Sequence, residues 1–174
     1  THALYYSING GAEAKITDGI GASYKWTVPY SLMSNIPNAK SATITLKLYT
    51  YNGSTNVGNS TASFTANVPD NSTTKPSVSL NSLLPVSGLP SKFSSLYVQG
   101  KSKVQANVSS SGKYGATIKS CVMTVDGVSY GEKQSYTSGY LTSYGEKTVT
   151  ITATDSRGLS NSVSQKISVV AYSV

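Results

Sequence analysis

The chain has 174 residues, a net charge of +7 and a pI near 9.4, and only 12% of its residues are charged. Serine and threonine fill 50 positions and no apolar period of 3.6 residues persists, so the composition predicts an all-β protein and argues against a helical one. The single cysteine, Cys121, excludes an intrachain disulfide, and no apolar run of about 20 residues could span a membrane as a helix.

The positive charge is spread from Lys15 to Lys166, and its densest pair is Lys101 and Lys103. A nucleic-acid site would gather basic side chains with interleaved aromatic residues, so nucleic acid is not an expected partner. The pattern is typical of a solvated basic surface. Weak attraction to anionic polymers, such as a charged cell envelope, is the alternative interpretation.

The first part of the chain predicts short strands at residues 2–7 and 12–16, each followed by glycine-containing turns. Tyr24, Trp26 and Val28 then alternate with polar residues, which predicts a further strand with Trp26 as a core anchor. A sugar-stacking platform is the alternative for Trp26. Between two prolines, residues 31–35 are expected to form one helical turn or an irregular crossover.

Two longer strands follow, joined by the tight-turn pair Asn52–Gly53. Alternating apolar residues predict the core face of each strand, Ala42, Ile44, Leu46 and Leu48 in the first and Ala62, Phe64, Ala66 and Val68 in the second. The next residues, 70–75, are polar and without an apolar period, which indicates a linker. We therefore expect an N-terminal β-sandwich domain at residues 1–69, lacking its first strand, and a second domain at residues 76–174.

The second domain begins with a strand containing Val78 and Leu80, and an irregular excursion at residues 83–90 follows. Strands are predicted at residues 103–109 and 118–125, and Asp126–Gly127 is a strong signal for a two-residue hairpin. Val149, Ile151 and Ala153 alternate with threonines, and a second alternating run ends at Ala171, which together predict a closing hairpin. About seven strands in about 100 residues are typical of an immunoglobulin-like domain.

A series of short motifs, spread over nearly the whole chain, resembles in sequence and order the motifs of one protein family. The motifs are THALYY at 1–6, SYKWTVP at 23–29, NIPN at 35–38, TYNG at 50–53, LYVQGKS at 96–102, VDG at 125–127 and TDSRG at 154–158. They are similar to minor structural proteins of tailed phages that infect Gram-positive bacteria, a family of largely unknown function built from tandem immunoglobulin-like domains. The resemblance implies an extracellular, virion location in the tail, and it leads us to expect that the sequence is an excerpt of a longer chain.

Catalytic chemistry is not expected from these residues. The only histidine is His2, so a Ser–His–Asp triad would have to use it, and no nucleophile elbow is present. No two acidic residues lie within three positions, and one cysteine and one histidine do not make a usual zinc site. Asp70–Asn71 is the nearest candidate for a calcium loop, but closely spaced acids are lacking. We predict no enzyme activity, no cofactor and no metal.

Thirteen tyrosines are the notable excess of the composition. Tyr136, Tyr140 and Tyr144 gather around one irregular stretch beside turn glycines, where loops meet at a sandwich end. A tyrosine has a flat apolar body with a polar tip, which suits recognition of sugars or proteins. These three residues are the predicted ligand-binding site, and the alternative is that tyrosines cover the sheet faces and plug the sandwich ends.

Together these observations predict a non-catalytic structural module of a phage tail or tail tip, with a contribution to host-surface attachment. A carbohydrate-binding or receptor-binding module and a bacterial surface adhesin fragment are the alternatives, because fold alone does not separate them. Other virion tail proteins are the expected partners, with self-association and host cell-wall polysaccharide as further candidates. Neither nucleic acid nor membrane is expected to be a partner.

Overall fold

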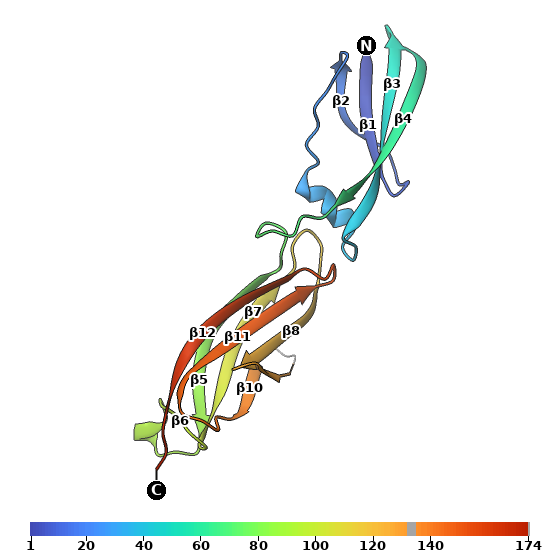
Figure 1. The fold of residues 1–174 in the computed structure, drawn as a ribbon. Helices are drawn as coiled ribbons and strands as arrows, with labels where there is room; N and C mark the ends of the chain where they lie inside the picture. Colours follow the sequence, from blue (N-terminus) through green and yellow to red (C-terminus); the bar gives the residue numbers. More distant parts are fainter. Residues whose placement is uncertain (132–134, 174) are drawn as a thin grey trace. The chain divides into compact units, whose positions relative to one another are not determined.

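The computed structural model describes residues 1–131 and 135–173, and the chain divides into two compact units, Thr1–Asp70 and Asn71–Val174 (Figure 1). Strands dominate both units. The helices among the described residues are short 3-10 segments, η1 (Tyr30–Asn35) and η2 (Ser91–Phe93), which confirms the all-β prediction.

Of the predicted linker residues, 71–75 belong to the second unit, where Thr74 is buried and its N–H donates to the Asn71 carbonyl at 3.2 Å. The predicted domain ends stay a prediction.

The first unit contains one antiparallel sheet with the strand order β2-β1-β3-β4. Its strands are β1 (His2–Ile8), β2 (Ala14–Ile20), β3 (Ser41–Asn52) and β4 (Thr55–Asn67). Because side chains alternate along a strand, Leu4, Ile44 and Leu46 share an apolar face with residues of η1 and the segment before it. The opposite face is polar, and there Tyr5 packs edge-on against Tyr49.

The strand predicted around Trp26 is wrong, because residues 21–29 pair with no strand of the sheet. Trp26 is half-buried instead, with its ring centroid 5.2 Å from that of Tyr6 in β1. Of the three alternating residues, Trp26 and Val28 are half-buried, whereas Tyr24 is 49% exposed. The helical turn expected at 31–35 is present as η1, whose Met33 is buried.

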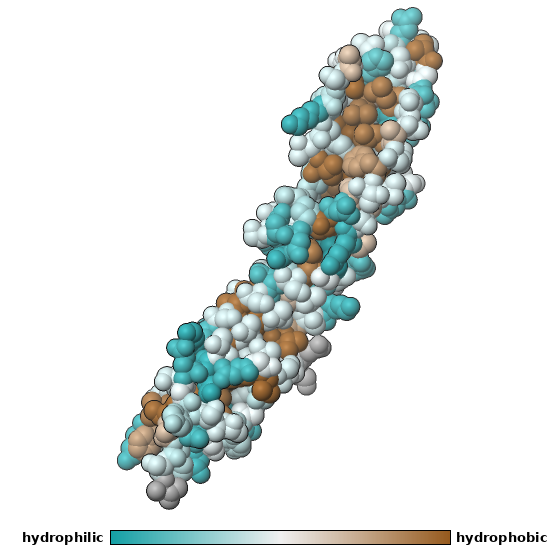
Figure 2. Space-filling model, viewed as in Figure 1, coloured by the Kyte–Doolittle hydropathy of each residue, from teal (hydrophilic) through white to brown (hydrophobic). Residues whose placement is uncertain are grey.

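The predicted core face of β4 is largely exposed. Phe64 is 41% exposed and Ala62 is exposed as well, although both share the apolar face of the sheet. The first unit contains one sheet, so no second sheet packs over this face of β4. Figure 2 shows hydrophobic residues gathered on the first unit, over the strands of its sheet.

The second unit is a β-sandwich of two sheets, ordered β10-β7-β5 and β6-β12-β11-β8-β9. Its strands are β5 (Ser77–Ser87), β6 (Tyr97–Val98), β7 (Ser102–Ser111), β8 (Ile118–Val125), β9 (Val128–Tyr130), β10 (Ser135–Tyr140), β11 (Gly145–Asp155) and β12 (Ser160–Val170). The core between them is built from the alternating apolar residues, with Val104, Met123 and Ile151 fully buried. This is the predicted immunoglobulin-like architecture.

Both predicted hairpins of the second unit are confirmed. Val125 pairs with Val128 across Asp126 and Gly127, whose φ values of 47° and 82° are both positive, as a type I′ turn requires. Thr154 pairs with Ser160 at the end of the β11–β12 hairpin. Cys121 in β8 is partly buried and packs against the core, as its alternation with Met123 predicts.

Two stretches predicted as irregular are strands. Residues 83–87 continue β5, and Pro85 is tolerated there because β5 is an edge strand whose N–H groups need no partner on the outer side. Residues 135–140 form β10, which pairs with β7. This second correction changes the position of the predicted tyrosine site.

Candidate functional site

The three tyrosines of the predicted ligand site do not form one surface. Tyr136 is only 3% exposed, and its hydroxyl donates a 2.7 Å hydrogen bond to the Cys121 carbonyl, so its ring belongs to the core. Tyr140 and Tyr144 are 57% and 65% exposed. Tyr136 is therefore not available to a ligand, whereas a binding role for Tyr140 and Tyr144 stays a prediction.

A register shift in β10 explains why Tyr136 and Tyr140 differ. Strict alternation would place both on the core side of the strand. The pairing with β7 shifts between Thr137 and Tyr140, and Ser138 accepts a 2.8 Å hydrogen bond from the Val104 N–H at this point. The irregularity turns Tyr140 outward, which is a known effect of β-bulges.

The end of the sandwich beside Tyr140 is held by hydrogen bonds between three segments. The Gly100 N–H donates to the Leu141 carbonyl at 2.7 Å, and the Gln99 N–H donates to the Val170 carbonyl at 2.9 Å. The side-chain amide of Gln99 donates to the Thr142 carbonyl at 3.1 Å. These bonds bring the turn between β6 and β7 beside the ends of β10 and β12.

Two lysine–tyrosine pairs with exposed rings lie at this end of the sandwich. Lys103 pairs with Tyr140 across β7 and β10, and its Nζ lies 4.8 Å from the ring centroid. Lys101, in the adjoining turn, has its Nζ 4.8 Å from the ring centroid of Tyr172, which is 47% exposed. Both distances suit a cation–π interaction. We call Lys101, Lys103, Tyr140 and Tyr172 the lysine–tyrosine cluster.

The cluster is positively charged and lies in the basic unit. Within the described ranges neither of its lysines forms an ion pair with a carboxylate. The first unit has four lysines and three acidic residues, for a net charge of +1. The second has nine lysines and Arg157 against four acidic residues, for a net charge of +6. Nearly all of the excess positive charge is thus in the unit that carries the cluster.

Most described carboxylates are engaged with lysines. Glu146 lies 2.6 Å from Lys166, Asp126 lies 3.0 Å from Lys147, and Asp18 pairs with Lys15. The Glu13 carboxylate binds the Lys47 ammonium at 2.9 Å and the Tyr49 hydroxyl at 2.8 Å, and these bonds lower the pKa of Glu13. In the part of the chain that the structure describes, no three potential metal ligands gather, and no helix has the length and apolar character to cross a membrane.

A separate hollow of about 230 Å³ lies in the first unit between η1 and the sheet. Its lining is almost wholly apolar and includes Ile8, Met33, Ile44 and Val68. A hollow of this size is smaller than the cavities that usually hold drug-sized ligands, and it offers few polar groups to orient one. It is therefore a weaker candidate than the cluster.

A family model described as a siphovirus protein of unknown function matches residues 1–174. The chain belongs to this siphovirus family. The expected family resemblance is thereby confirmed. The match covers both units and supports a phage structural role, but it names no ligand.

Comparison with curated proteins gives no match. Among solved structures, the fibronectin(III)-like modules of Clostridium thermocellum CbhA align with 97% of this chain and 78% of theirs, at 15% identity and a TM-score of 0.45. A protocadherin gammaB7 EC3-6 cis-dimer structure aligns with 98% of this chain and 40% of that chain, at 16% identity and a TM-score of 0.31. Neither likeness bears on ligand or function.

Proposed function

We propose that this siphovirus protein is a non-catalytic structural module of the phage tail or tail tip, and that its second unit contributes to attachment by binding an anionic polysaccharide of the host cell wall. Membership of the siphovirus family supports the structural role. The lysine–tyrosine cluster supports the attachment role, because it sets two exposed rings beside two ammonium groups at one end of the sandwich.

The cluster offers the two interactions that a charged glycan needs. The exposed part of a tyrosine ring packs against the C–H face of a sugar, and its hydroxyl remains available for hydrogen bonds. The ammonium groups of Lys101 and Lys103 attract phosphate or carboxylate groups carried by the polymer. The net charge of +6 on this unit adds a longer-range attraction, which salt screens over about 10 Å at 0.1 M.

The non-catalytic part of the proposal is supported by the state of the acidic side chains. Hydrolysis of a glycan generally needs two carboxyl groups that flank one bond. In the described ranges, Glu13, Asp18, Asp126 and Glu146 each pair with a lysine. Asp155 is buried and accepts hydrogen bonds from the N–H groups of Arg157 and Leu159 in the β11–β12 turn.

Sedimentation with purified cell walls of candidate Gram-positive hosts tests the site. The double variants Y140A/Y172A and K101Q/K103Q should each bind about tenfold more weakly, since each removes two surface contacts with the polymer and one such contact contributes about 0.5–1 kcal/mol. The matched control is K119Q, which removes one exposed lysine of the same unit that has no ring partner among the described contacts. K119Q should bind nearly as the unchanged protein does.

Three outcomes would contradict the proposal. Undiminished binding by both double variants would exclude the cluster, and a folded protein that binds no host wall would leave only the structural role. Release of reducing sugar from the walls would contradict the non-catalytic assignment. Added salt should weaken binding of the unchanged protein more than that of K101Q/K103Q, because that variant has lost part of the screened attraction.

A further inference from the structure

The sheet edges of this protein are unequally protected against pairing with another chain. Natural sheets protect their edges with charged residues, proline, bulges or short strands. In the second unit, β6 and β9 are only 2 and 3 residues long, β10 has a register shift, and β5 has both a register shift and Pro85. Each of these described edges therefore carries at least one protecting feature.

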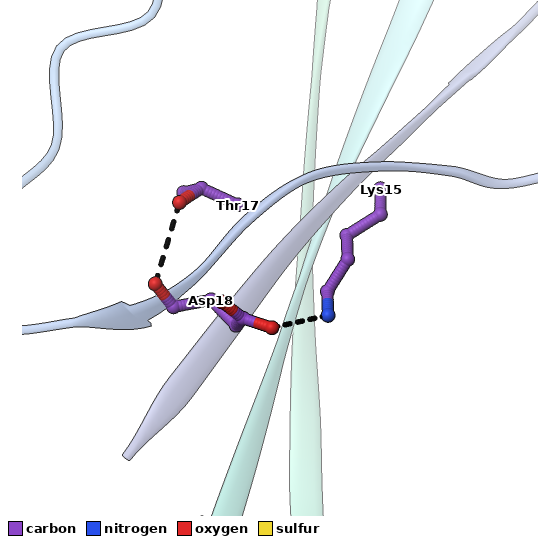
Figure 3. Close-up of polar contacts among 3 residues, drawn as sticks. All are labelled: Lys15, Thr17 and Asp18. Atoms are coloured by element: carbon purple, nitrogen blue, oxygen red, sulfur yellow. Dashed lines mark hydrogen bonds and ion pairs between the residues drawn. The ribbon is translucent and has the colours of Figure 1, made fainter.

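The two edges of the first unit contrast strongly. β2 carries Lys15 and Asp18, which form an ion pair along the edge (Figure 3), and its pairing with β1 has two register shifts. β4 is the opposite edge and has 13 residues. It contains neither a charged residue nor a proline. Its register shift lies near the start of the strand, between Asn56 and Gly58, and residues 59–67 pair with β3 without a shift. All of these nine residues except Ala66 are exposed.

We propose that β4 pairs with β4 of a second copy of this chain, in antiparallel orientation about a two-fold axis at Ser63. An exposed edge strand presents unpaired N–H and C=O groups to a partner strand. A two-fold axis perpendicular to the sheet keeps the apolar face and the polar face of both copies on the same sides. The result is one continuous sheet of eight strands across two copies of the first unit.

The sequence of β4 is self-complementary in this register. Ser63 faces its own copy, Thr61 faces Thr65, and Phe64 faces the small side chain of Ala62. Hydroxyl pairs of this kind already join β3 to β4, where the Thr45 and Ser63 hydroxyls lie 2.8 Å apart. The pairing of large Phe64 with small Ala62 avoids a clash and covers part of the exposed phenyl ring.

Charge permits a second copy as the occupant of this edge. The whole chain carries a net charge of +7, so most contacts between copies would be repulsive, but β4 is uncharged along its length and the first unit has a net charge of only +1. Like charges directly opposite each other in a sheet are destabilising, and in this register no two charged residues of β4 face each other. The inference does not depend on wall binding, which is assigned to the second unit.

Sedimentation velocity of the full chain over a wide range of protein concentration tests the inference. The unchanged protein should dimerise, and S63K should remain monomeric because two lysines would meet at the axis. The matched control is S164K. Ser164 is exposed and has its hydroxyl 2.8 Å from that of Thr150, so it is Ser63's counterpart in the second unit. S164K should dimerise as the unchanged protein does.

A mixing experiment keeps the result interpretable if S63K is simply misfolded. S63K and S63E should each remain monomeric alone, and should form a heterodimer when combined because the opposite charges then meet at the axis. A monomer of the unchanged protein at every concentration would overturn the proposal. An S63K protein that dimerises normally would overturn it too, as would the absence of a heterodimer from folded S63K and S63E.

Discussion

Tyr136 and Tyr140 lie four residues apart in one strand and serve different purposes. The ring of Tyr136 is in the core and its hydroxyl bonds the Cys121 carbonyl, while Tyr140 is turned outward beside Lys103. The spacing alone predicts that they share a face, and the register shift in β10 separates them. A tyrosine thus stabilises the core at position 136, whereas at position 140 it forms part of the exposed surface.

This contrast gives a prediction about stability. Tyr136→Ala should lower the free energy of unfolding by about 3–5 kcal/mol, because it leaves a cavity in the core and removes the hydrogen bond to the Cys121 carbonyl. Tyr140→Ala should lower it by less than about 1 kcal/mol, the range for an exposed cation–π pair. Urea denaturation monitored by far-ultraviolet circular dichroism measures the free energy of unfolding of both variants. Equal effects of the two substitutions would contradict the assignment of Tyr136 to the core.

Asp126 gives a prediction about pH. Its carboxylate accepts the Thr148 N–H at 2.9 Å and pairs with Lys147 at 3.0 Å, and these interactions lower its pKa below the ordinary value of 3.8. Because the folded-state pKa is the lower one, the stabilisation is present above the ordinary value and is lost as the pH falls through the folded-state pKa. Asp126→Asn, which suits the same turn, should therefore be less stable than the unchanged protein at neutral pH.

The measurement is the free energy of unfolding of both proteins from neutral pH to pH values below the ordinary pKa of Asp126. The difference between them should shrink as the pH falls, since protonation removes the same charge that the substitution removes. A difference that stays constant with pH would show that the carboxylate's ionic interactions do not stabilise the hairpin.

At the scale of elements, the sequence predicts strands best where the apolar period is long and its turns are specific. The β11–β12 hairpin and the turn at Asp126–Gly127 are examples, because both depend on contacts close in the chain. Residues 21–29 show the limit, because their alternating pattern belongs to a segment that pairs with no strand. Pro85 led to the opposite error, because it predicts an irregular stretch where β5 continues; an edge strand accepts a proline.

The candidate site was predictable only in part for a similar reason. The sequence singles out Tyr136, Tyr140 and Tyr144 as a ligand site, of which only Tyr140 and Tyr144 are exposed, and Lys101 and Lys103 as the densest pair of charges. The pairing of Lys103 with Tyr140 depends on the register between β7 and β10, which are separated by more than twenty residues of chain. The contact of Lys101 with Tyr172 joins segments still farther apart, and no local pattern predicts it.

At the scale of the whole molecule, the two units carry different features. The first has little net charge and an uncharged edge strand whose residues 59–67 pair regularly with β3, and the second has most of the positive charge and the lysine–tyrosine cluster. Our two proposals follow this division: self-association is proposed for the first unit and polymer binding for the second. The two proposals are independent, so S63K should abolish dimerisation while each second unit retains its intrinsic affinity for cell walls.

The most direct test of the attachment role is an NMR titration of the full chain with a solubilised anionic polysaccharide from a host cell wall. Amide shifts should change at residues 99–103, 140–142 and 170–172, which meet at one end of the sandwich, and these changes should be lost in K101Q/K103Q. Shift changes confined to other parts of the molecule, or changes that persist unaltered in K101Q/K103Q, would contradict the proposed site.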